Sequence, residues 1–196
     1  VDGIFSNGSN AIITNSGIIT GTDDGIDSTG ANAIITNSGT INADYGIYSK
    51  GNGDIINNSG TINADEDGFL SSGAKANMTN SGTINAADYG IYSDGADAII
   101  TNSGTINTDA VGIDSSGTGA IITNSGTING PFGIYSSGAN TIITNSGTIN
   151  GTKGIESNGT GSIINNSGHI TGTNYAIEGG ITDGLTLNLL KGSQLM

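Results

Sequence analysis

The stretch Asn145-Ser146-Gly147-Thr148-Ile149 occurs eight times, with small changes, along this chain of 196 residues. The copies begin at positions from Asn15 to Asn166 and follow one another at intervals of 21 or 22 residues. A fixed period in this range is typical of proteins built from stacked units, in which each unit packs on its neighbours. The period therefore predicts a repeat architecture.

A second motif, Gly-Ile-x-Ser, precedes each copy at a constant distance of 12 residues, as at residues 133–136. The Ile of Thr-Ile-Asn always lies 4 residues after the Asn of each copy. Only the distance from this Ile to the Gly of the next Gly-Ile-x-Ser motif varies, between 5 and 6 residues. Because a single step absorbs all the length variation, we expect one corner of each unit to be a surface loop that tolerates insertion.

Each unit contains three short strand candidates separated by turn residues, for example residues 133–136, 141–145 and 148–150. We expect an all-β fold, a right-handed parallel β-helix with coils of 21–22 residues and three short strands per coil; the handedness follows the general preference for right-handed crossovers. The solenoid is expected over residues 3–178, with about eight full coils and a degraded ninth. Residues 179–196 form a Leu-rich segment that breaks the pattern, either as the start of a further solenoid or as a junction module.

Alternation of side chains along a strand assigns the inner and outer faces. In the fourth coil Asn77 and Met78 replace the Ile-Ile pair that the fifth coil has at Ile99 and Ile100. Met is the better core residue, so the second Ile is expected to point inward, together with the Asn two residues later. Exchanging the two faces remains the alternative, and it would place the Asn column outside.

An inward Asn column requires hydrogen-bond partners, because a buried amide without partners is costly. Stacked amides can donate to one neighbouring coil and accept from the other. We therefore predict a structural ladder, and we expect the Ser column of Gly-Ile-x-Ser to form a similar one. The predicted Asn ladder comprises Asn15, Asn37, Asn58, Asn80, Asn102, Asn124, Asn145 and Asn166.

The composition argues against several classes of function. The net charge is −13, with 17 acidic residues against four lysines and no arginine, which disfavours nucleic acid and anionic membranes as partners. There is no Cys, so no disulfide framework or Cys-based site is expected, and no apolar run reaches the length of a membrane-spanning helix. The chain begins at Val1, and we interpret it as a fragment of a longer protein.

Catalysis, a metal and a cofactor are not expected. His169 is the one histidine and occupies a Thr position of the repeat, so a surface substitution explains it better than a catalytic role. Acidic residues gather in the variable corner, at Asp23-Asp24, Asp44, Asp65-Glu66-Asp67, Asp88 and Asp109. A calcium site is conceivable there, but a solvated acidic edge that discourages aggregation is the preferred interpretation.

Eight of the nine aromatic residues occupy two positions that flank the Gly-Ile corner, interleaved with acidic residues. Such an edge suits stacking on sugars or pairing with another copy of the chain; alternatively the rings shield and stiffen the corner. A second stripe, the outward Ile residues from Ile12 to Ile163, is another candidate face for self-association. The predicted partner- or glycan-contact stripe comprises Phe5, Tyr45, Tyr48, Tyr89, Tyr92, Phe132, Tyr135 and Tyr175.

The repeated Ile-Thr-Asn-Ser-Gly-Thr-Ile-Asn, combined with Gly-Ile-Tyr-Ser, resembles the passenger domains of bacterial autotransporters of type V secretion, over about residues 3–178. The chain is most similar to the self-associating and adhesive class. This resemblance implies a parallel β-helix displayed on the bacterial cell surface and anchored through a C-terminal outer-membrane barrel outside this chain. Some relatives carry sugars on Ser in their repeats.

The expected function is therefore that of a non-catalytic cell-surface adhesin module, mediating adhesion, self-association or biofilm formation through repeated weak contacts. Its expected partners are a second copy of itself, or a glycan or protein of a host or cell surface, without nucleic acid and without membrane insertion of this chain. Two alternatives come from other classes: an ice- or surface-binding solenoid, and a polysaccharide-processing enzyme.

Overall fold

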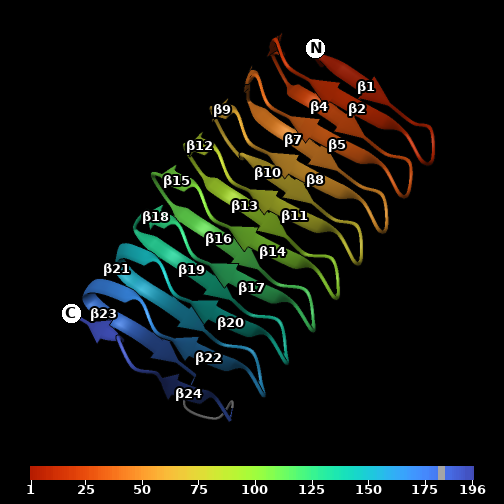
Figure 1. The fold of residues 1–196 in the computed structure, drawn as a ribbon. Coiled ribbons are helices and arrows are strands. Elements are labelled where there is room, and N and C mark those ends of the chain that lie inside the picture. The colour runs from red at the N-terminus through yellow and green to blue at the C-terminus, as the bar shows by residue number, and fades with distance from the viewer. Residues whose placement is uncertain (181–183) are drawn as a thin grey trace.

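A computed structural model describes residues 1–180 and 184–196. In these residues the chain is all-β, a solenoid of about 9 turns with about 22 residues per turn and parallel pairing between successive turns. Figure 1 shows the strands stacked in chain order from one end of the rod to the other. The described residues include no helix that could span a membrane. The predicted parallel β-helix is thus confirmed.

Each full coil contributes one strand to each of three faces. The isoleucine sheet carries the Ile-Ile-Thr-Asn strands and has 9 strands. In chain order, its strands are β2 (Ile12–Asn15), β5 (Ile34–Asn37), β8 (Ile55–Asn58), β11 (Asn77–Asn80), β14 (Ile99–Asn102), β17 (Ile121–Asn124), β20 (Ile142–Asn145), β22 (Ile163–Asn166) and β24 (Thr186–Leu189).

The tyrosine sheet carries the Gly-Ile-x-Ser strands, and the threonine sheet carries the Thr-Ile-Asn strands. The tyrosine sheet contains β1 (Ile4–Ser6), β4 (Asp24–Ser28), β7 (Tyr45–Ser49), β10 (Phe69–Ser71), β13 (Tyr89–Ser93), β16 (Val111–Ser115) and β19 (Phe132–Ser136). The threonine sheet contains β3 (Ile18–Thr20), β6 (Thr40–Ala43), β9 (Thr61–Ala64), β12 (Thr83–Ala86), β15 (Thr105–Thr108), β18 (Thr127–Asn129) and β25 (Gln194–Leu195). Two long strands, β21 (Thr148–Ser157) and β23 (His169–Gly179), run through the variable corner and join these two faces into one 16-stranded sheet.

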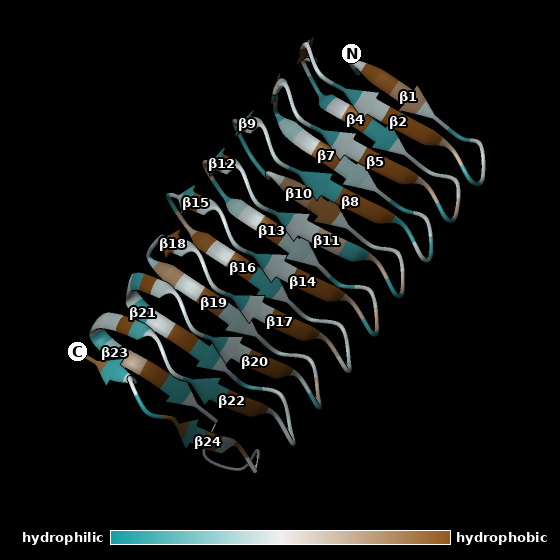
Figure 2. Ribbon diagram, in the orientation of Figure 1, coloured by the Kyte–Doolittle hydropathy of each residue, from teal (hydrophilic) through white to brown (hydrophobic). Residues whose placement is uncertain are grey.

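The core is a set of stacked aliphatic rows, one from each sheet. In the fifth coil Ile91, Ile100 and Ile106 are fully buried, whereas Ile99 is exposed. The predicted assignment of inner and outer faces is therefore confirmed. Figure 2 shows the consequence, since hydrophobic and hydrophilic bands recur at the same places in successive strands.

Close approach of successive coils explains the repeated glycines at two corners. A Cβ on Gly46 would lie 2.4 Å from Ile62 Cγ2 and 2.5 Å from the Gly68 oxygen, and a Cβ on Gly60 would lie 2.0 Å from the Gly39 oxygen. Any side chain at these positions would push the backbones apart and break the interstrand hydrogen bonds.

The Leu-rich segment continues the stack where the structure describes it. Strand β24 pairs in parallel with β22, placing Leu187 beside Ile164 and Leu189 beside Asn166, and β25 pairs with β23. The segment therefore adds two sides of a further coil to the same sheets. Residues 181–183 of the predicted segment lie outside the described residues.

Candidate functional site

The predicted aromatic stripe lies on the outer surface of the tyrosine sheet, in two parallel columns. Phe5 and Tyr175, at opposite ends of the chain, are exposed, and the other six rings are half-buried. The strand register places Asp27, Leu70, Asp114, Glu156 and Glu178 in the column of Phe5, Tyr48, Tyr92 and Tyr135. The second column, beside the corner, contains Asp24 and Tyr45 as register neighbours and runs in later coils from Tyr89 through Val111, Phe132 and Lys153 to Tyr175. We call these two columns the aromatic–acid edge.

Rings of the same strand contact each other across the two columns. The ring centroids of Tyr45 and Tyr48 lie 6.4 Å apart in a tilted arrangement, and those of Tyr89 and Tyr92 lie 5.3 Å apart, edge to face. These are favourable geometries for aromatic pairs. Strands β7 and β13 thus each present a preformed pair of rings at the surface.

Two acidic side chains of the variable corner are buried, which differs from the predicted solvated acidic edge. Asp24 and Asp67 are buried, whereas Asp65, Glu66 and Asp109 are exposed as expected. Residues of the next coil contribute to these surroundings, since Asp24 has Tyr45 as its register neighbour and the Tyr89 amide donates to Asp67 Oδ1. A single repeat does not reveal such neighbours.

Burial shifts the acid–base properties of these carboxylates. It raises the pKa of Asp67 to about 6, although the Tyr89 amide donates a hydrogen bond of 3.2 Å to Asp67 Oδ1 and opposes the shift. Burial also raises the pKa of Asp114 to about 6, and the charge of Asp88 adds to this effect. Both groups thus pass from neutral to charged in the mildly acidic range.

Lysine side chains neutralise part of the edge from within the chain. Lys50 Nζ lies 3.4 Å from each carboxylate oxygen of Asp27 and 3.9 Å from the centre of the Tyr48 ring. Lys153 Nζ lies 2.8 Å from Glu156 Oε2 and 2.6 Å from Glu178 Oε2. Lys153 Nζ also lies 5.4 Å from the centre of the Phe132 ring, so each of these two ammonium groups contacts both carboxylate and aromatic side chains.

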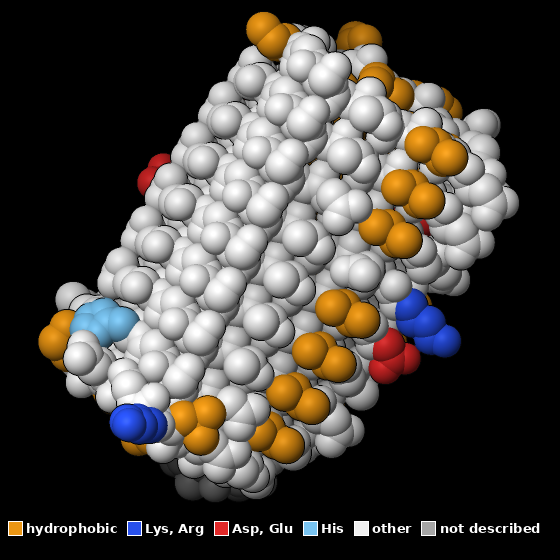
Figure 3. Space-filling model, in the orientation of Figure 1, with side chains coloured by type: hydrophobic (Ala, Val, Ile, Leu, Met, Phe, Trp, Pro, Cys, Tyr) orange, Lys and Arg blue, Asp and Glu red, His pale blue; other side chains and the backbone are white. Residues whose placement is uncertain are grey.

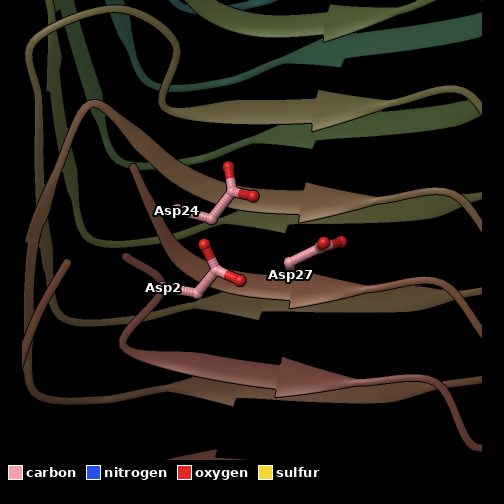
Figure 4. A group of neighbouring side chains, drawn as sticks. All are labelled: Asp2, Asp24 and Asp27. Carbon is pink, nitrogen blue, oxygen red and sulfur yellow. The ribbon is translucent and has the colours of Figure 1, made fainter. Parts of the chain in front are cut away.

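Asp2, Asp24 and Asp27 form the one acidic cluster among the described residues that could hold a metal ion (Figure 4). One carboxylate oxygen from each lies within 4.8 Å of the others. Burial raises the pKa of Asp24 to about 6, assisted by the charges of Asp27, Asp23 and Asp2. The ammonium of Lys50, beside Asp27, reduces the repulsion within this cluster, and below about pH 6 a proton on Asp24 adds to this effect.

The predicted inner Asn ladder is present and continuous. Each amide donates from Nδ2 to Oδ1 of the Asn one coil later, over 2.7–2.8 Å, from Asn15 to Asn166. At the first coil Asn15 Oδ1 accepts from the Gly17 amide, and at the last coil Asn166 donates to Ser193 Oγ. Both ends of the ladder are therefore capped.

The predicted Ser ladder is wrong. Ser49 donates to Asp54 and Ser136 donates to Thr141, both five residues later in the chain. The remaining buried hydroxyls of this Ser column have no hydrogen-bond partner among the described residues; they belong to Ser28, Ser71, Ser93, Ser115 and Ser157. A Ser side chain is too short to bridge the spacing of about 4.8 Å between stacked strands, whereas the longer Asn amide reaches its neighbour.

A second Asn ladder, which was not predicted from the sequence, runs along the outside of the threonine sheet. Asn63 donates to Asn42, and the same bond recurs in the following coils up to Asn150. The amides of Asn63, Asn85 and Asn107 line an open groove of about 480 Å³ beside the variable corner. The recurring Asn after the inward Ile of Thr-Ile-Asn was the available signal.

The outward Ile stripe lies on the isoleucine sheet, as predicted. Figure 3 shows a column of hydrophobic side chains over this face, with one interruption. Asn77 stands in that column between Ile55 and Ile99. The exposed members are Ile12, Ile34, Ile55, Ile99, Ile121 and Ile142.

No family model matches the chain, and no curated protein or solved structure matches it.

His169, for which a surface substitution was predicted, lies beside Gln194 on the threonine sheet, with Nδ1 2.9 Å from Gln194 Oε1.

Proposed function

We propose that this chain is a non-catalytic adhesive module of a bacterial cell surface, of the autotransporter passenger type, which contacts a partner through the aromatic–acid edge. The observation that carries the proposal is the arrangement of that edge. Eight aromatic side chains and several carboxylates lie in two columns on one outer face of the rod.

The periodicity supports a multivalent mode of contact. Each coil repeats the same outward positions after one strand spacing, so a partner with its own repeat can engage several coils at once. Contacts that are individually weak then add through their high effective concentration. A second copy of the chain, whose edge has the same spacing, is the first partner to test.

The test is analytical ultracentrifugation over a wide concentration range. The first variant changes Tyr45, Tyr48, Tyr89, Tyr92 and Tyr135 to Ser, and the matched control changes five exposed residues of the other stripe, Ile34, Ile55, Ile99, Ile121 and Ile142, to Thr. Circular dichroism checks that both variants retain the wild-type β content.

We expect dimers or larger species in the wild type and in the Ile variant, and monomers in the Tyr variant. Loss of association in the Ile variant alone would indicate that the isoleucine sheet, and not the aromatic–acid edge, makes the contact. Monomers in all three proteins would rule out self-association, and binding to glycan arrays would then test the edge against sugars.

A second candidate, a surface- or ice-binding solenoid, is favoured by one feature of the isoleucine sheet. Its outward Ile column lies beside a registered column that contains Thr14, Thr36, Thr101, Thr123 and Thr144. Asn57 and Asn165 interrupt that column. Thermal hysteresis of the purified chain, abolished in the Ile variant, would identify this function.

A further inference from the structure

A cleft of about 210 Å³ lies on the aromatic–acid edge between the coils of β13, β16 and β19. It is lined by Tyr89, Val111, Asp114, Phe132 and Tyr135. The walls are therefore mainly aromatic or aliphatic, and Asp114 supplies the one carboxylate of the lining.

The carboxylate of Asp114 is buried without a partner. Only 8% of the residue is exposed, and Oδ1 has no hydrogen-bond partner among the described residues. A buried ionised carboxylate is costly unless a cation or hydrogen-bond donors compensate it. The floor of this cleft thus favours a positively charged ligand group.

The same edge already holds such a group at another coil. Asp27 has Tyr48 as its register neighbour in the next coil, and Lys50 follows Tyr48 by two residues. The Lys50 ammonium lies against both the carboxylate and the ring. The chain's own lysine therefore shows which chemistry an aspartate and a tyrosine in this register accept.

At the Asp114 cleft the corresponding lysine is missing. Asp114 has Tyr135 as its register neighbour in the next coil, but the residue two positions after Tyr135 is Ser137, which is exposed. The lysine of the second column, Lys153, has Nζ 5.4 Å from the centre of the Phe132 ring, but its ammonium is paired with Glu156 and Glu178. The cleft thus has the aspartate and tyrosine of the Asp27 arrangement, with no lysine paired with Asp114 among the described residues.

We propose that the Asp114 cleft binds the side chain of a lysine from a partner protein, with the ammonium on the Asp114 carboxylate and the methylene stem against the surrounding rings. This inference rests on the proposed function, because it names the ligand group for the same edge. Charge complementarity supports it, since the chain carries a net charge of −13. An ammonium over an aromatic face and beside a desolvated carboxylate gains from both contacts.

The test is an NMR titration of the intact chain, following the ring protons of Tyr89 and Tyr135. The probe is Nα-acetyl-lysine methylamide, and the matched control is the norleucine analogue, which has the same stem without the charge. A third arm uses glucosamine, an ammonium on a hydroxylated ring. Two variants accompany the wild type: Asp114→Asn, which removes the charge, and Ser137→Lys, which supplies an internal competitor at the Lys50 position.

We expect saturable shifts when the lysine probe is added to the wild type. The wild type should bind the norleucine analogue at least about tenfold more weakly than the lysine probe. Both variants should bind the lysine probe at least about tenfold more weakly than the wild type does. Lys50→Ser, which vacates the equivalent position at Asp27, is expected to add a second set of shifts at Tyr48. Because Ser137 is exposed, the Ser137→Lys variant leaves the fold and the cleft walls intact.

Equal binding of lysine and norleucine probes, or undiminished binding in the Ser137→Lys variant, would overturn the proposal. Preference for glucosamine over the lysine probe would overturn the assignment to a lysine side chain. Tyr-dependent self-association without lysine binding would refute this inference while leaving the proposed function standing.

Discussion

The inner Asn ladder and the buried Ser column are the same kind of feature in two corners of the coil, yet only one of them is satisfied. Both columns are polar and repeated at every turn, and both are buried from the second coil onward. The Asn amides bond to one another through the whole stack, whereas Ser28, Ser71 and Ser93 have no partner among the described residues. The difference shows that the reach of a side chain, compared with the spacing of the strands, decides whether a column can form a ladder.

The largest expected effect comes from breaking the inner ladder with Asn102→Ala. Asn80 loses its acceptor and Asn124 loses its donor, and both amides are fully buried. Leaving two buried groups unsatisfied costs about 3 kcal/mol of unfolding free energy. Urea denaturation followed by circular dichroism measures the change.

The matched control is Asn107→Ala in the outer ladder, where water can replace the lost amide. Its cost is expected to stay below about 1 kcal/mol. Equal losses in the two variants would mean that burial does not distinguish the ladders.

A smaller effect is expected from Asp114, which adjoins one of the unpartnered serines in β16. Its pKa is about 6 in the fold and near 3.8 in the unfolded chain, so ionisation destabilises the folded state. This destabilisation is absent below about pH 4 and complete above about pH 6. Asp114→Asn is therefore expected to stabilise the protein by about 2 kcal/mol near pH 7 and to have almost no effect near pH 4.

Urea midpoints of both proteins at the two pH values test this expectation. Asp109→Asn serves as the control, because it removes an equal charge from an exposed position. A gain that is the same at both pH values would show that the buried charge is not its cause.

The smallest effect is expected from repairing one serine. Ser136 donates to Thr141 Oγ1 over 3.0 Å, and Thr141 in turn donates to the Gly138 oxygen. Ala120 occupies the position of Thr141 in the coil of Ser115. Ala120→Thr is therefore expected to add about 1 kcal/mol of stability, and Thr141→Ala to remove about as much. Destabilisation by Ala120→Thr would mean that this corner has no room for the added side chain.

The repeat and its inner and outer faces could be predicted because the same sequence pattern recurs in every coil. The period fixes the stack, and the replacement of an Ile-Ile pair by Asn77 and Met78 distinguishes the outer from the inner position. The inner Asn ladder followed from the same assignment. These features depend only on local spacing and on the alternation of side chains.

The errors concern distances and neighbours that one coil does not specify. The Ser ladder failed because a hydroxyl does not reach from coil to coil. The burial of Asp24 and Asp67, which were predicted to lie on a solvated edge, depends on neighbouring coils. The recurring Asn of Thr-Ile-Asn indicates where the outer Asn ladder lies. Its hydrogen bonds, however, depend on side-chain rotamers, such as those of Asn42 and Asn63.

Seven successive junctions of the inner ladder have the same bond, at 2.7–2.8 Å. Excising the 22 residues 90–111 would bring Asn80 and Asn124 into the relation that Asn80 and Asn102 now have. The same holds for duplicating one coil. A gene that encodes such a rod can therefore lengthen or shorten it by whole repeats, through unequal recombination, without any compensating substitution. The length of the rod can then change between generations without any change in the chemistry of its faces.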